Sequence, residues 1–168
     1  MKLTAKIKLK PNKMQYDLLL ETLEVANQAC NDISNMAWEN QIFKQFDIHR
    51  LAYKTIRANY ALTSQVVVRA IAKVAQAYKV GKESKRLFKK HGTFPYDSRI
   101  LRFKTSDELV NIWTMGGRQE MPYLCGDRQR ELLEGKRGES DLCLINDEFY
   151  LFVSCDVEEP KPIDIEGV

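Results

Sequence analysis

The spacing of the apolar residues changes twice along this chain, and the two changes limit the folds that it can adopt. Residues 2–10 alternate between apolar and mostly lysine side chains, which is the period of a half-buried strand. From residue 12 to about 80 the apolar residues recur every three or four positions, as in amphipathic helices, and after Pro95 the strand period returns. We therefore expect one strand, then helices, then several more strands.

The helical part divides into three expected helices. Their ranges are 12 to about 43, 47 to about 59, and 63 to 81. Asn12 is a suitable N-cap for the first helix, and Gln15 three residues later completes a capping box. Thr63 or Ser64 can cap the third helix. A short basic helix or turn is expected next, across residues 82–90.

Five further strands are expected after Pro95. Their ranges are 99–104, 109–115, 119–125, 141–145 and 149–156. Gly116-Gly117 and Asn146-Asp147-Glu148 are typical of hairpin loops, and residues 127–134 of a short polar helix or loop. A strand at residues 2–10 that stood alone would leave its backbone groups unpaired, so we expect it to join the later sheet. The expected fold is α+β, a small antiparallel β-barrel interrupted after its first strand by a helical insertion.

The length of 168 residues fits one domain built from interleaved parts. The expected division is 1–11 for the first barrel strand, 12–92 for the helical insertion, 93–159 for the rest of the barrel and 160–168 for a linker. No apolar run approaches the ~18–20 residues that cross a membrane. Because the N-terminus also lacks a hydrophobic signal core, we expect a cytoplasmic protein.

The net charge of +3 hides a strong asymmetry. Residues 69–104 contain 11 basic and two acidic side chains, whereas residues 139–168 contain nine acidic and one basic. A solvated helix face explains many scattered charge runs. A bias of nearly one sign over 36 residues instead favours contact with a polyanion, and nucleic acid is the polyanion that we expect.

The residues that carry chemistry are few. Cys30, Cys125, Cys143 and Cys155 lack the Cys-x-x-Cys spacing, so we expect reduced and mostly buried thiols, with a disulfide or a zinc site as weaker alternatives. We find no Gly-rich phosphate loop, nucleophile elbow or metal-ligand cluster. The sequence therefore predicts no catalytic constellation, no metal site and no cofactor.

Candidate nucleic-acid-binding residues follow from charge and position. Amide and guanidinium groups on the polar face of the third helix suit base edges and phosphates, and they are Gln65, Arg69, Lys73 and Gln76. The basic side chains after them suit phosphates, and they are Lys79, Lys82, Lys85, Arg86, Lys89 and Lys90. The remaining candidates lie on the outer face of the first strand or on loops of the barrel, and they are Lys6, Lys8, Arg118, Arg128 and Arg130.

Six stretches of this sequence resemble the amino-terminal portion of the TnpB (OrfB) family, the transposon-encoded RNA-guided DNA nucleases related to type V CRISPR effectors. They are LLETLEVANQACN (19–31), QVVVRAIAKVAQAYK (65–79), FPYDSRIL (94–101), GGRQ (116–119), GESDL (138–142) and CDVEEP (155–160). Together they extend over nearly the whole chain. The resemblance implies a wedge-like barrel interrupted by a helical recognition domain.

In that family this lobe grips the guide RNA scaffold and the guide–target heteroduplex and reads a short motif beside the DNA target. The resemblance therefore implies guide RNA, target DNA and the nuclease domain of the same parent protein as partners. The family's RuvC-like catalytic carboxylates match no residue here, since Asp164 and Glu166 correspond to the linker, so we do not expect this chain to be an enzyme. The alternative is a TnpB-derived regulatory or protein-interaction module with no direct nucleic-acid role.

Overall fold

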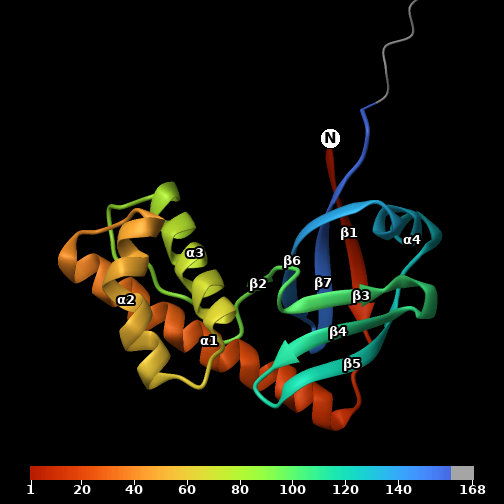
Figure 1. Ribbon diagram of the computed structural model, residues 1–168, viewed down its shortest axis with the longest axis horizontal. Coiled ribbons are helices and arrows are strands. Elements are labelled where there is room, and N and C mark those ends of the chain that lie inside the picture. Colours follow the sequence, from red (N-terminus) through yellow and green to blue (C-terminus); the bar gives the residue numbers. More distant parts are fainter. Residues whose placement is uncertain (160–168) are drawn as a thin grey trace, which may run out of the picture.

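The computed structural model describes residues 1–159, and the linker expected at 160–168 lies outside them (Figure 1). The helices are α1 (Lys13–Asn40), α2 (Gln45–Asn59), α3 (Ser64–Val80) and α4 (Asp127–Glu134). The strands are β1 (Lys2–Leu9), β2 (Phe94–Tyr96), β3 (Leu101–Lys104), β4 (Leu109–Thr114), β5 (Gly117–Leu124), β6 (Lys136–Ile145) and β7 (Glu148–Asp156). The fold is α+β with a helical insertion after the first strand, which confirms the expected class.

The seven strands of the described residues form one antiparallel sheet that curls into a nearly closed barrel. Their order is β2-β6-β7-β1-β5-β4-β3. β1 lies in the middle, paired with β7 from Lys2↔Asp156 to Lys8↔Tyr150 and with the end of β5 at Leu9↔Tyr123. The first strand therefore joins the later sheet, as expected. The barrel stays open where β3 faces the β2–β6 edge.

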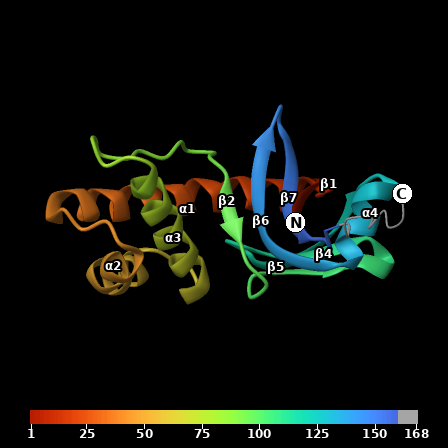
Figure 2. The same cartoon turned by 90° about the horizontal axis from the view of Figure 1, so that it is seen from above.

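α1 connects the barrel to the helical part (Figures 1 and 2). Its N-terminus has the predicted capping box, in which Asn12 and Gln15 exchange side-chain-to-backbone hydrogen bonds. Gln15 also donates through Nε2 to the carbonyl of Glu120 on β5, at 2.9 Å. Farther along, α1 packs with α2 and α3 around buried residues such as Leu23, Ile33 and Ala37. One apolar stripe of α1 thus contributes to a core that the helices and the barrel share.

The predicted strand and turn signals mostly place the later elements correctly. Asn146 and Asp147 have φ angles of 51° and 63° and form the two-residue turn between β6 and β7. The turn of the β4–β5 hairpin consists of Met115 and Gly116, which is one residue earlier than the expected turn at Gly116-Gly117. Thr63 is the cap of α3, since its hydroxyl accepts from the backbone N–H of Val66.

The structure corrects three sequence predictions. The structure contains a strand, β2, that the sequence does not predict. Three residues with a proline at the centre are too few to show the apolar–polar alternation of a strand. β6 begins at Lys136 rather than at residue 141, because its first five residues are polar and sit beside a bulge. Of the helix or turn expected at residues 82–90, the helix is wrong: this segment has neither helix nor strand, and it contains bends and ends in a turn. Between the two alternatives for residues 127–134, the structure has the helix, α4.

All four cysteines are free, and three of them are buried. Burial raises the pKa of the Cys30 thiol to about 12, so this sulfur stays protonated at neutral pH. The expectation of mostly buried thiols is confirmed. Separately, none of the helices within residues 1–159 is both long and apolar enough to cross a bilayer.

Replacing Thr22 with valine should loosen the contact between α1 and the barrel. The buried Thr22 hydroxyl donates to the carbonyl of Leu18 at 2.6 Å and accepts from the N–H of Met115 at 2.9 Å. Thr22→Val keeps the shape and leaves the Met115 N–H without its partner, which costs about 1–3 kcal/mol of unfolding free energy. Urea unfolding measures it, with the exposed Thr55→Val on α2 as the matched control. Equal stability of the two variants would contradict this role of Thr22.

Candidate nucleic-acid interface

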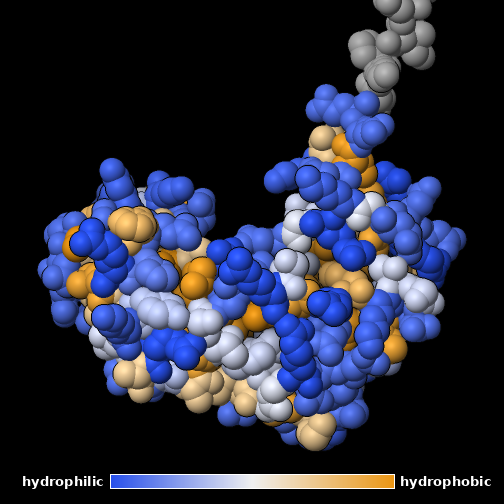
Figure 3. Space-filling model, in the orientation of Figure 1, coloured by the Kyte–Doolittle hydropathy of each residue, from blue (hydrophilic) through white to orange (hydrophobic). Residues whose placement is uncertain are grey.

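The polar face of α3 lines a groove between the helices and the barrel. Arg69, Lys73 and Gln76 border a pocket of about 530 Å³, with Glu139 and Asp141 of β6 on the opposite side. Figure 3 shows the notch between the two parts of the molecule on this face. Three of the four α3 residues predicted from sequence therefore share one groove, but its far wall is acidic.

Arg69 is held by the protein itself. Its side chain is 18% exposed, its guanidinium lies 3.5 Å from the Asp97 carboxylate, and it forms an ion pair with Glu139. Gln65 donates to Asp97 and accepts from Arg99 at 3.1 Å. This network joins α3 to the segment after β2 and to β6. Arg69 and Gln65 consequently fix the helix against the barrel, and their predicted contacts with bases would require these bonds to open.

Lys73 is also engaged internally. Its ammonium donates to the side-chain oxygen of Asn27 at 2.6 Å and to the carbonyl of Thr93, and it lies 5.1 Å from the centre of the Phe88 ring. Burial lowers the pKa of Lys73, with nearby acidic groups such as Asp141 opposing the shift. The geometry therefore shows Lys73 tying α1, α3 and the following loop together.

Five successive basic residues after this position have a different environment. They are Lys79, Lys82, Lys85, Arg86 and Lys89. None of the five forms an ion pair within the part of the chain that the structure describes, and four of them are exposed. Lys82 lies 5.9 Å from the Phe43 ring, and Lys85 donates to the Asn35 side chain at 3.1 Å. This stretch carries unpaired positive charge, most of it on a segment without regular structure.

Other predicted cations are neutralised by nearby carboxylates. These ion pairs are Lys8–Glu148 at 2.9 Å, Lys90–Glu24 at 3.8 Å, Arg128–Glu131 at 3.3 Å, and Arg130 with both Glu108 and Asp127 at 2.7 Å. Lys6 instead lies over the Tyr150 ring, at 4.6 Å from its centre. Arg118 donates to Asn111 at 2.8 Å and to the carbonyl of Arg99. The structure therefore brings together only part of the predicted set.

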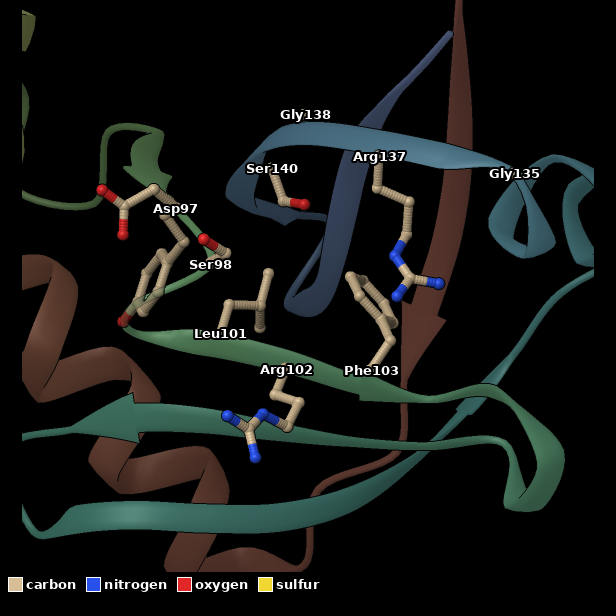
Figure 4. A pocket seen from close by; sticks show the side chains of 10 residues that line it. Asp97, Ser98, Leu101, Arg102, Phe103, Gly135, Arg137, Gly138 and Ser140 are labelled. Carbon is tan, nitrogen blue, oxygen red and sulfur yellow. The ribbon is translucent and has the colours of Figure 1, made fainter. Parts of the chain in front are cut away.

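Sequence reasoning missed a second pocket, at the open side of the barrel (Figure 4). Its volume is about 450 Å³, and its lining includes Arg102 and Phe103 of β3 and Arg137 and Ser140 of β6. The Arg137 guanidinium lies 5.2 Å from the centre of the Phe103 ring, so this pair bridges the opening. Nothing local in the sequence predicts which strands face each other here, because the meeting of β3 and β6 depends on the closure of the whole barrel.

Within residues 1–159 no three histidine, cysteine, aspartate or glutamate side chains lie close enough together to hold a metal ion. The Asp141 carboxyl group has a raised pKa, because it is partly buried and lies near Glu139. The exposed surface of α3 and the loop after it carries five lysines and Gln76, together with the acidic Glu83 and the apolar Val80 and Leu87.

A search against protein-family models found no match for this chain, and a search of the curated proteins found none either.

Arg69→Met should destabilise the fold, because it removes the guanidinium but keeps the apolar stem. Asp97 and Glu139 then lose their shared cation, at a cost of about 1–3 kcal/mol in unfolding free energy. Lys79→Met removes an exposed, unpaired cation from the same helix and should change stability by less than about 0.5 kcal/mol. Urea denaturation of both variants measures the difference. If the two variants lose equal stability, Arg69 does not hold α3 to the barrel.

Proposed function

We propose that this chain is a nucleic-acid-binding lobe similar to the amino-terminal part of TnpB proteins. In this role it grips the scaffold of a guide RNA and lies against the guide–target heteroduplex and the DNA motif beside the target. Guide RNA, target DNA and a nuclease domain of the same parent protein are its proposed partners. Two independent lines support this: the six resembling stretches, and the interrupted-barrel architecture that the resemblance implies.

The observation that carries the proposal is the run of cations from Lys79 to Lys89. Basic side chains of this protein that are paired with carboxylates contribute little to the positive electrostatic potential at the surface. The five cations of this run form no ion pair within the described residues, so they can exchange their counterions for phosphates. Contacts of this kind give affinity and orientation, while base pairing by a guide would supply the sequence specificity.

A second candidate function, a protein-interaction module, is favoured by three exposed apolar side chains on the helical part. Phe46, Val80 and Leu87 are each more than 70% exposed. Such residues are common at protein interfaces. The two functions differ in their response to salt, because an apolar interface changes little with ionic strength, whereas phosphate contacts weaken steeply.

Reversing the charge of the unpaired cations should weaken RNA binding. Lys82, Lys85 and Lys89 are changed together to glutamate, and binding to a labelled RNA hairpin is followed by fluorescence anisotropy between about 50 and 200 mM salt. We expect weaker binding and a salt slope reduced by about 1 for each phosphate that the variant no longer neutralises.

The control reverses three exposed cations of α2 with the same change in net charge: Arg50, Lys54 and Arg57. If wild-type protein does not bind the hairpin at low salt, nucleic-acid binding is rejected and the interaction module is favoured. If both triple variants weaken binding equally, the effect reflects net charge rather than this surface.

We also propose that the chain does not cut DNA by itself, since the resembling stretches contain none of the family's catalytic carboxylates. Purified protein incubated with supercoiled DNA and Mg²⁺ or Mn²⁺ should leave the substrate intact. A nicking activity that co-elutes with the protein and disappears with EDTA would overturn this part of the proposal.

A further inference from the structure

The loop between α3 and β2 is fixed along its length by side chains of α1. Residues 81–93 contain neither helix nor strand, yet they run alongside α1 from the end of α3 toward β2 (Figure 2). The backbone of residues 86, 88, 90 and 92 is hydrogen-bonded to side chains of the helices. We call residues 85–89 the basic strap.

Three polar side chains of α1 make most of these bonds. Asn31 accepts from the N–H of Phe88 at 2.7 Å and donates to its carbonyl at 3.1 Å, as a neighbouring strand would. Asn27 donates to the carbonyl of Gly92 at 2.8 Å. Ser34 donates to the carbonyl of Arg86 at 2.5 Å. Because these three residues are spaced by four and then three, they lie on one face of the helix.

The alternation of these bonds determines what the basic strap presents to solvent. The backbone groups of Arg86 and Phe88 are bonded to side chains of the helices, whereas the N–H and C=O of Leu87 between them have no hydrogen-bond partner within residues 1–159. The side chains of Lys85, Leu87 and Lys89 are all exposed, with Leu87 at 76%.

We propose that the basic strap is a preorganised site for the phosphates of one nucleic-acid strand, with Asn27, Asn31 and Ser34 as its positioning residues. Lys85 and Lys89 flank the free N–H of Leu87. The Lys85 ammonium donates to the Asn35 side chain of α1 at 3.1 Å, and it exchanges this bond for a phosphate when the strand binds. Residues two apart in an extended chain are about 6.5–7 Å apart, which suits contact with successive phosphates. The inference rests on the proposed function, because it assumes a nucleic-acid ligand.

The positioning role has a physical reason. A flexible lysine-rich loop loses backbone freedom when it binds, and this loss reduces its affinity. Here the neutral side chains of α1 have already fixed the backbone during folding. Removing one of them should therefore weaken binding although no charge is lost.

The test compares Asn31→Leu with Asn40→Leu. Both variants make the same change on α1, but the Asn40 amide bonds only the carbonyl of Met36 on its own helix. With a labelled RNA hairpin as probe, we expect Asn31→Leu to bind about tenfold more weakly, with a smaller salt slope, and Asn40→Leu to bind like wild type. Hydrogen exchange at the Phe88 amide should be faster in Asn31→Leu only.

A double-mutant cycle with Lys89→Gln separates positioning from general stability. If Asn31 acts through the basic strap, Lys89→Gln costs less affinity in the Asn31→Leu background than in wild type. Should Asn31→Leu fail to fold, Ser34→Ala takes its place: it removes the hydroxyl that donates to the Arg86 carbonyl and lies 2.8 Å from the Tyr78 hydroxyl. If the folded variant binds RNA with wild-type affinity and salt slope, the positioning role of α1 is overturned, and the proposed function is unaffected. Absence of RNA binding by wild-type protein would overturn the proposed function as well.

Discussion

The packing of α1 against both the helical part and the barrel is the constraint on which the rest of this structure depends. A helix of 28 residues is about 42 Å long, enough to reach under the barrel and through the helical part. Its first half is bonded to the β4–β5 hairpin by Gln15 and Thr22. Its second half packs with α2 and α3 and carries the amides that fix the basic strap. The barrel and the strap are therefore positioned by the same rigid element.

Charge alone does not identify a binding surface in this protein. Arg69 and Lys73 belong to the basic block, but the first is bound to Asp97 and Glu139 and the second to Asn27 and Thr93. Their role in the fold is to hold neighbouring segments together. Five other cations of the block lie at the end of α3 and on the segment after it, and they form no ion pair with the described residues.

Local patterns in the sequence predict the parts of this fold that local physics determines. The capping box at Asn12, the Thr63 cap and the two-residue turn at Asn146 all depend on residues within a few positions, and all three are confirmed. β2 depends on its pairing with β6, and the ion network of Arg69 depends on a partner 70 residues away, so neither has a local signal. The local excess of basic residues predicts where the candidate site lies. Which of these cations are paired with carboxylates can be seen only in the tertiary structure.

The central place of β1 in the barrel has a consequence for synthesis of the protein. β1 is made first, yet its long partner β7 ends at Asp156, and the intervening helices need neither strand to pack together. At translation rates of about 5–20 residues per second, β1 waits roughly 7–30 s for that partner. Charged side chains on an exposed strand disfavour pairing with other chains, and the lysines at alternate positions of β1 are side chains of this kind.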